Sequence, residues 1–390
     1  MYVILKAFFR TPPKQILRRL LFRLNDRVLS FSPSGTPRGR VLLSYITRPF
    51  TFLADSQLEG HANYWEAKDM AAAFLERGYI VDVIDFHNTQ FIPKHLYDIF
   101  IDVAGNIGRI SPQLPTTCKK IFFATGADPT FQNKAEKKRI AQFKTRRGVS
   151  VKPRRYMPER NGIAHADIIG GLCGTFPAST YVHYGKPMHM VHVSSPQVYP
   201  FVENKAFDKA RKNFLWFGGA GAVHKGLDIV LDAFRDMPEF SLTVCGKFEG
   251  EEDFVKAYKT ELYETANIHT IGYVNPASKI FERIQNECVA VISVSCSEGC
   301  ATSIVVAMHA GLIPIVNQET GINVENFGIM LPSSTLIDLK NAIRALSEET
   351  SAVLEEKSRC SWTYARTYHT REQFGKEFRR FIDTLENNYA

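Results

Sequence analysis

One stretch of the chain, residues 289–316, joins two apolar segments through a polar turn. It begins with a run of Val and Ile bounded by small polar residues, which predicts a buried parallel strand. A polar turn from Ser295 to Ser303 follows, then an apolar series that predicts a helix ending at Gly311, and then a short apolar strand. This unit is typical of an open α/β sheet, which binds its ligand beyond the carboxyl ends of the strands.

The turn of this unit favours an anion. Free backbone N–H groups and a helix N-terminus meet there, so a phosphate is the ligand that we expect. The carboxylate of Glu298 lies in the same turn. Because it cannot bind a phosphate, we expect it to accept hydrogen bonds from hydroxyls on the molecule that carries the phosphate. The alternative is a carboxylate that only stabilises the start of the helix.

A second glycine-rich turn lies between a predicted strand at 213–218 and a predicted helix at 226–236. It contains Gly218, Gly219, Lys225 and Gly226. Glycines let the backbone approach a phosphate closely, and a Lys just before a helix can place its ammonium on a diphosphate. A tight structural turn is the alternative. Since both turns are expected at the same edge of one sheet, together they predict a diphosphate site.

These two turns resemble the two nucleotide-sugar motifs of the family 4 glycosyltransferases, which have the GT-B fold. Glu298 and Gly299 match the start of one motif. Gly219, Lys225 and Gly226 match the other. The resemblance is strongest over residues 213–331.

The chain departs from the family at two positions. Val306 stands where the family has a second Glu, which is associated with the ribose, and Ala220 stands where it has an Arg. The hydroxyl of Thr302 or Ser303 could replace the ribose contact. His224 or a basic residue of the first domain would have to replace the missing cation.

The resemblance implies a hexosyltransferase that takes its sugar from a nucleoside diphosphate sugar with retention of configuration. A Lys and a helix N-terminus stabilise the leaving diphosphate without a metal, and the sequence has no Asp-x-Asp pair, so we expect neither metal nor cofactor. Two alternatives stay open: a nucleotide-sugar 2-epimerase, and a non-catalytic nucleotide-sugar-binding scaffold.

Two first-domain residues complete the predicted site. His61 and Asp128 lie in loops after predicted strands, where they could align donor and acceptor across a cleft; the alternative for both is an ordinary loop residue. The predicted catalytic residues are Glu298, Lys225, His61 and Asp128. The predicted donor-binding residues are Gly218, Gly219, Lys225, Gly226, Glu298, Gly299, Cys300, Thr302 and Ser303.

Alternating strands and helices predict two doubly wound, Rossmann-like domains that face a cleft. The proline-containing segment 194–213 is the best boundary between them. We expect a basic amphipathic leader at 1–39, an acceptor-side domain at 40–196 and a nucleotide-sugar-binding domain at 197–369. The resemblance implies that the helix at 370–390 returns to the first domain.

The whole chain of 390 residues has a net charge of +8, and its basic residues concentrate in the first half. Nine Lys or Arg accompany the single Asp26 in residues 1–40, and ten accompany Glu136 in residues 134–155. The segment 14–29 predicts a basic amphipathic helix, which either lies on an anionic membrane surface or packs on the first domain. We expect a saccharide or lipid-linked saccharide acceptor, in polysaccharide biosynthesis of the cell envelope, and no nucleic acid.

The chain is expected to be cytoplasmic, with the membrane contact on the inner face. No apolar run is long enough to span a bilayer, and the N-terminus is too basic for a secretory signal. The seven cysteines form no C-x-x-C pair, which indicates free thiols in a reducing compartment. Cys296 and Cys300 flank the key turn, but no metal site is expected there.

Overall fold

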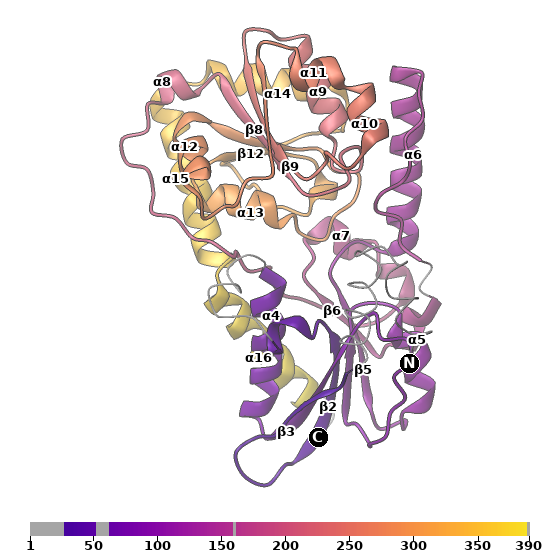
Figure 1. Ribbon diagram of the computed structural model, residues 1–390. Helices are drawn as coiled ribbons and strands as arrows, with labels where there is room; N and C mark the ends of the chain where they lie inside the picture. The colour runs from indigo at the N-terminus through magenta and orange to yellow at the C-terminus, as the bar shows by residue number, and fades with distance from the viewer. Residues whose placement is uncertain (1–26, 52–61, 159–160, 388–390) are drawn as a thin grey trace, which may run out of the picture.

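The computed structural model describes residues 27–51, 62–158 and 161–387. Two domains, each built on a parallel sheet with helices on both faces, stand one above the other (Figure 1). The predicted fold class is confirmed. The first sheet has the strand order β1-β3-β2-β4-β5-β6-β7. Its strands are β1 (Leu29–Phe31), β2 (Gly39–Tyr45), β3 (Tyr79–Asp85), β4 (Ile99–Asp102), β5 (Lys119–Ala124), β6 (Ile168–Gly171) and β7 (Met188–Met190).

The second sheet has the order β10-β9-β8-β11-β12-β13, and all its neighbours are parallel. Its strands are β8 (Asn213–Gly218), β9 (Ser241–Gly246), β10 (Ile268–Gly272), β11 (Ala290–Ser293), β12 (Ile313–Val316) and β13 (Ile329–Met330). Every residue of β11 is buried, because helices cover both faces of the sheet. The edge strand β1 is the exception to the parallel pattern: it pairs antiparallel with β3, with Leu29 opposite Val83.

The first domain contains α4 (Ala62–Glu76), α5 (Asn106–Ile110), α6 (Pro129–Arg147) and α7 (Thr175–Ser179). The second contains α8 (Phe207–Ala210), α9 (Leu227–Arg235), α10 (Glu252–Ala257), α11 (Lys259–Tyr263), α12 (Lys279–Glu287), α13 (Thr302–His309), α14 (Leu336–Glu348) and α15 (Ser351–Tyr368), and α16 (Arg371–Asn387) follows. Short 3-10 turns occupy Arg48–Phe50, Ser111–Gln113, Asn161–His165, Val182–Tyr184 and Gln318–Thr320.

The last helix, α16, lies against α4 of the first domain (Figure 1). Arg379 forms ion pairs with Asp69 at 3.0 Å and with Glu76 at 2.7 Å. On the buried side, the Phe378 ring meets the Phe74 ring edge-on. The chain therefore crosses between the domains again near residue 369, as it does near residue 194.

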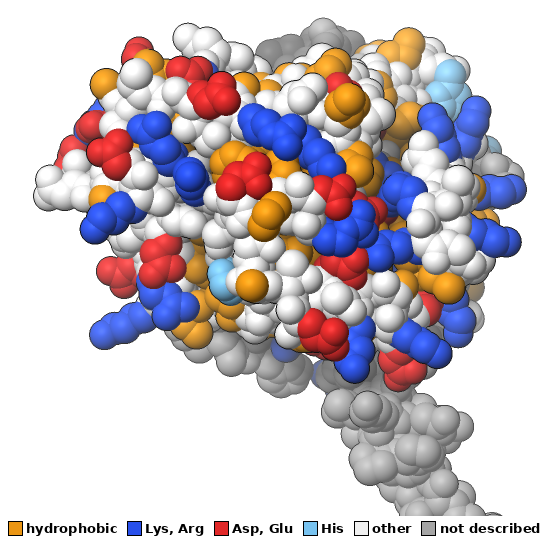
Figure 2. Space-filling view, turned by 90° about the horizontal axis from the view of Figure 1, so that it is seen from above, with side chains coloured by type: hydrophobic (Ala, Val, Ile, Leu, Met, Phe, Trp, Pro, Cys, Tyr) orange, Lys and Arg blue, Asp and Glu red, His pale blue; other side chains and the backbone are white. Residues whose placement is uncertain are grey.

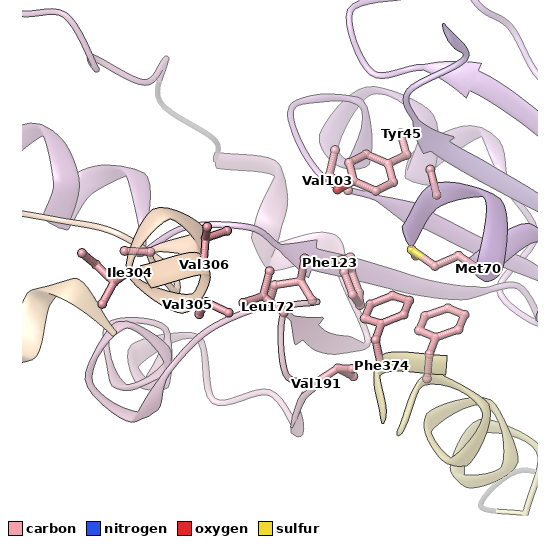
Figure 3. Packing of buried hydrophobic residues seen from close by; sticks show 14 of the residues in the cluster. Tyr45, Met70, Val103, Phe123, Leu172, Val191, Ile304, Val305, Val306 and Phe374 are labelled. Atoms are coloured by element: carbon pink, nitrogen blue, oxygen red, sulfur yellow. The ribbon is translucent and has the colours of Figure 1, made fainter. Parts of the chain in front are cut away.

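One apolar core continues across the domain border. Val305 and Val306 of α13 share a buried cluster with Leu172 and Phe123 of the first domain, and Figure 3 shows Val305 beside Leu172. Burial on this scale is the main force that holds two domains together. The helix that begins at the predicted phosphate turn is thus packed directly on the first domain.

Helix α6 begins in the first domain, and its C-terminal half stands beside the second (Figure 1). Phe143 of α6 and Val151 just after it are buried in the apolar core of the second domain. Figure 2 looks down on that domain, and Lys and Arg side chains gather at its edge on the side where α6 stands. Helix α6 thus bridges the two domains.

Ion pairs reinforce this bridge, and they define a cluster that we call the α6 clamp: Arg139, Arg146, Arg147 and Arg154 with Asp228, Asp232, Asp253 and Glu261. Arg146 pairs with Asp228, and Arg147 pairs with Asp232 at 2.5 Å and with Glu261 at 2.7 Å. The carboxylates of the second domain therefore already neutralise four of the ten basic residues in 134–155. These four do not contribute to an outward anion-binding surface.

In the described part of the chain, no helix is both long and apolar enough to cross a bilayer. The predicted amphipathic helix at 14–29 lies almost wholly outside the described residues. Of its positions that the structure describes, 27–29, Leu29 begins strand β1.

Candidate functional site

The second sheet changes direction between β8 and β11. From β8 the chain builds β9 and β10 on one side, then returns to place β11 on the other side. The loops after β8 and β11 therefore diverge at the carboxyl edge, where open α/β sheets bind ligands. Lys225 lies in the loop after β8 and Glu298 in the loop after β11.

The structure brings these two side chains together. The Lys225 ammonium forms an ion pair with Oε1 of Glu298, and Ser295 Oγ donates to the same oxygen at 3.1 Å. Both side chains remain slightly exposed, at 15% and 13%. Burial alone would raise the pKa of Glu298, but Lys225, His224 and Arg155 lower it to about 2. The carboxylate is therefore ionised at neutral pH and serves as a hydrogen-bond acceptor.

His224 connects the two loops through contacts of its ring with protein atoms. Its ring is buried; Nε2 lies 2.6 Å from the Ser297 backbone oxygen, and Nδ1 lies 3.5 Å from Cys296 Sγ. Glu136 of α6 approaches Nδ1 at 3.7 Å. Because protein atoms contact both ring nitrogens, His224 is not in a position to replace the family Arg that is missing at Ala220.

The glycines of the first loop have different roles. Gly226 adopts a left-handed φ of +74° at the start of α9, and a Cβ there would lie 2.5 Å from the Val294 oxygen. A Cβ at Gly218 would strike the Trp216 ring at 2.7 Å. Only Gly219 faces open space, with Lys225 Cε as its nearest neighbour at 3.9 Å. Gly226 and Gly218 thus serve packing, and Gly219 leaves room for a ligand.

A carboxylate already occupies two amides of this loop. Glu251 accepts the N–H groups of Gly221 at 2.6 Å and of Ala222 at 3.1–3.2 Å. These amides are fixed by the protein, so the N–H groups available to a phosphate are those nearer Gly219.

Gly299 lies at the domain border. A Cβ there would approach the Thr125 oxygen at 2.9 Å and Gly126 at 3.0 Å, and the Gly299 oxygen accepts the N–H of Gly174 at 3.0 Å. Gly299 was predicted as a donor-binding residue. The structure shows a further reason for a glycine here, the close approach of the first domain.

The start of α13 offers hydroxyls but no second carboxylate. Thr302 and Ser303 are half-buried on its first turn, and Val306, one turn later, is only 2% exposed in the apolar cluster. Cys300 precedes this helix, and burial raises the pKa of its thiol. A carboxylate at position 306 would have no polar partner in this cluster.

Of the two first-domain candidates, the structure describes only Asp128, which does not join this group. Asp128 is the N-cap of α6: Oδ1 accepts the N–H groups of Thr130 and Phe131, and Oδ2 accepts the Tyr184 hydroxyl at 3.1 Å. The side chain is buried and capping satisfies it. His61 lies outside the described residues.

A hollow of about 740 Å³ opens at the domain border beside Cys300. The first domain contributes Thr175 and Ser179, and the second contributes Gln318, Asn323 and Tyr364. No sequence pattern indicated these residues, because they come from three separate segments without a motif. No group of three or more His, Cys, Asp or Glu in the described ranges could hold a metal ion.

Comparisons with known proteins agree with this fold. Residues 201–366 match the family Glycosyl transferases group 1. The fold is similar to that of sucrose-phosphate synthase from Thermosynechococcus elongatus, with a TM-score of 0.62 and 13% identity over 91% of this chain and 100% of that one. HepE from Anabaena, solved with UDP and glucose, gives a TM-score of 0.55 and 13% identity over 90% and 100%.

The fold is also similar to that of TarM from S. aureus, with a TM-score of 0.51 and 9% identity over 72% of this chain. The match spans only 54% of TarM, about half its length. No curated protein matches the sequence. Residues 201–366 thus form a domain of the family Glycosyl transferases group 1, and the two parallel-sheet domains together have the GT-B fold.

Proposed function

We propose that the protein transfers a hexose from a nucleoside diphosphate sugar to a saccharide or lipid-linked saccharide, with retention of configuration and without a metal. Uridine is the base that we favour. The HepE structure contains UDP and glucose, and a TarM structure contains UDP and alpha-GlcNAc-glycerol. The resemblance to family 4 supports retention.

The observation that carries the proposal is the meeting of Lys225 and Glu298 at the switch point of the second sheet. When the bond between the sugar and the diphosphate breaks, negative charge grows on the leaving oxygen. The Lys225 ammonium and the start of α13 stabilise that charge. Glu298 accepts hydrogen bonds from sugar hydroxyls and so fixes the sugar relative to the diphosphate.

Donor binding shifts the partner of Lys225. In the structure its ammonium is paired with Glu298, and a diphosphate offers it a second, more highly charged partner. The hydroxyls of the donor sugar then take its place on Glu298. Both side chains are thus in position at the site before the donor arrives.

The test is release of UDP from UDP-glucose and UDP-GlcNAc, with and without oligosaccharide acceptors and with and without EDTA. We expect acceptor-dependent, EDTA-resistant turnover that falls at least about 100-fold in Lys225→Ala and in Glu298→Gln. Lys376→Ala and Glu282→Gln, on exposed faces of α16 and α12, are the matched controls.

The other outcomes separate the alternatives. Conversion of the donor to its C2 epimer without any acceptor would identify an epimerase. Binding of UDP-sugars with no turnover would identify a scaffold. Loss of activity in EDTA that Mg²⁺ or Mn²⁺ restores would contradict the metal-independent mechanism.

For the acceptor, we propose an anionic lipid-linked saccharide at the inner face of the cell membrane. Lys134, Lys137, Lys138 and Lys144 of α6 are exposed and lie outside the α6 clamp. Sedimentation with vesicles that contain anionic lipid, but not with purely zwitterionic vesicles, would support this localisation. Equal sedimentation with both, or with neither, would contradict it.

A further inference from the structure

We propose that Arg155, a residue of the first domain, supplies a second cation to the diphosphate of the donor. The donor site is then shared between the two domains. This inference rests on the proposed function, because it assigns a residue to the same diphosphate.

The side chain of Arg155 lies over the glycine loop that precedes Lys225. Gly221 adopts a left-handed φ of +94°, and a Cβ there would lie 2.9 Å from Arg155 Cγ and 3.3 Å from Cδ. The guanidinium is close enough to Glu298 to act on its carboxylate electrostatically, together with Lys225. Arg155 therefore extends from the first domain to the loop where the diphosphate is expected.

The position of Arg155 is fixed by buried side chains of α6. Glu136 Oε1 accepts the backbone N–H groups of Arg154 and Arg155, both at 3.0 Å. Gln132 donates its side-chain amide to the backbone oxygen of Arg155. Glu136 and Gln132 are 3% and 7% exposed. The residue is thus held on both sides of its backbone, while its side chain is exposed.

The charge balance at the site leaves a role for this guanidinium. Lys225 is paired with Glu298, so together they carry no net charge, whereas a diphosphate brings at least two negative charges. Arg154, next along the chain, is paired with Asp253 at 2.5 Å. Among the residues that the structure describes, no carboxylate forms an ion pair with Arg155. Its planar guanidinium can donate two parallel hydrogen bonds to phosphate oxygens.

The α6 clamp gives this assignment a structural basis. Helix α6 carries Glu136 and Gln132, and its arginines bind Asp228 and Asp232 of the second domain. The clamp therefore holds the segment of Arg155 against the loop of Lys225. A first-domain residue can act at a second-domain site because this helix crosses the border.

The test is calorimetric binding of UDP, UMP and uridine to the full chain and to three variants. We expect Arg155→Gln to weaken UDP binding about 10- to 100-fold, to weaken UMP binding much less and to leave uridine binding unchanged, since the guanidinium acts on charged phosphate oxygens. Arg155→Lys keeps the positive charge but loses the planar guanidinium, so its UDP affinity should lie between those of the wild type and Arg155→Gln. Lys152→Ala, an exposed cation of the same segment, is the control and should bind like the wild type.

Three results would overturn the inference, and they are distinguishable. Wild-type UDP affinity in Arg155→Gln would reject it and leave the proposed function intact. Equal losses for UDP, UMP and uridine would show that the residue acts through the fold, and a lowered unfolding midpoint would accompany them. If the wild type binds neither UDP nor ADP nor GDP, the proposed function fails, and this inference fails with it.

Discussion

Nε2 of His309, on the last turn of α13, lies 3.0 Å from the backbone oxygen of His369. The same oxygen accepts the N–H of Ser195 at 3.0 Å, and His369 Nδ1 lies 3.0 Å from the Val193 oxygen. One imidazole therefore ties the helix of the candidate site to the two places where the chain crosses between domains. Burial lowers the pKa of His309 and of His369 to about 4, so both rings are neutral at pH 7.

Replacing His309 should weaken this junction. His309→Ala removes the hydrogen bond to His369 and leaves a cavity in the core, so we expect a loss of about 2–4 kcal/mol in the free energy of unfolding. Urea unfolding at pH 7.5 measures it. His183→Ala, on an exposed 3-10 turn, is the control. Equal unfolding midpoints for the two variants would show that the hydrogen bond between His309 and His369 does not stabilise the junction.

Glu66 of α4 should make stability depend on pH. It is buried and accepts the N–H and hydroxyl of Ser194, both at 2.9 Å; burial raises its pKa from 4.5 to about 7. A carboxyl group whose pKa is raised on folding stabilises the fold below about pH 4.5. That contribution, on the order of 3 kcal/mol, is lost as the pH rises through 7.

Glu66→Gln should remove this pH dependence, because a neutral amide can still accept both hydrogen bonds. We expect the unfolding midpoint of the variant to rise relative to wild type between pH 5 and pH 8 in thermal melts. Glu348→Gln, an exposed residue of α14, should track the wild type. A constant difference between Glu66→Gln and wild type would show that Glu66 does not titrate in this range.

Asp232 is central to the α6 clamp. It is 3% exposed and accepts from Arg147, from Arg146 at 3.2 Å and from the Tyr258 hydroxyl at 3.0 Å. Asp232→Ala leaves these donors without their shared acceptor, and we expect a loss of about 3 kcal/mol in unfolding free energy. Denaturant unfolding with Asp208→Ala as the control, whose side chain is 84% exposed, tests this. A loss no greater than that of the control would mean that the clamp contributes little.

Gly174 lies where the two domains approach each other closely. Its φ is −68°, which any residue adopts, but a Cβ there would lie 2.1 Å from the Gly321 oxygen. Gly174→Ala should push the loops apart, so we expect donor turnover to fall about 10-fold or more, as a shift of about 1 Å at a site can do.

Gly105→Ala is the matched control for Gly174→Ala, since φ is −93° and nothing lies within 4 Å of its Cβ position. Turnover in both variants equal to wild type would show that this contact does not position the site. Small-angle scattering of the free proteins would show whether Gly174→Ala separates the domains.

The local sequence predicted the second sheet and the shared edge at which the loops of Lys225 and Glu298 lie, but not the ion pair between them. Both follow from order along the chain: apolar runs predict β8 and β11, and loops after neighbouring parallel strands share one edge. The strand β1 was missed, because three residues that directly precede a Ser- and Pro-containing segment carry no periodic pattern. Asp128 was expected to align donor and acceptor from a loop, and the structure shows it as the N-cap of α6. Asp before Pro129 is an N-cap signal that could have identified the start of this helix.

The α6 clamp could not be predicted in the same way. The sequence shows a basic block at 134–155, but not that the partners of Arg146 and Arg147 are Asp228 and Asp232, more than eighty positions later. A cluster of charged residues in the sequence shows the sign of the charge but not which residues pair with it. An internal network of ion pairs and an exposed basic surface therefore have the same sequence pattern. Arg155 was hidden among these residues for the same reason.

Helix α6 also determines whether the second domain could exist alone. A fragment of residues 197–369 would lack Phe143 and Val151, which fill its apolar core, and would leave Asp228 and Asp232 without their arginines. Such a fragment should be poorly soluble and unable to fold independently. Adding residues 129–157 in trans as a separate peptide should restore its packing. The boundary between the domains along the chain is therefore not a boundary between folding units.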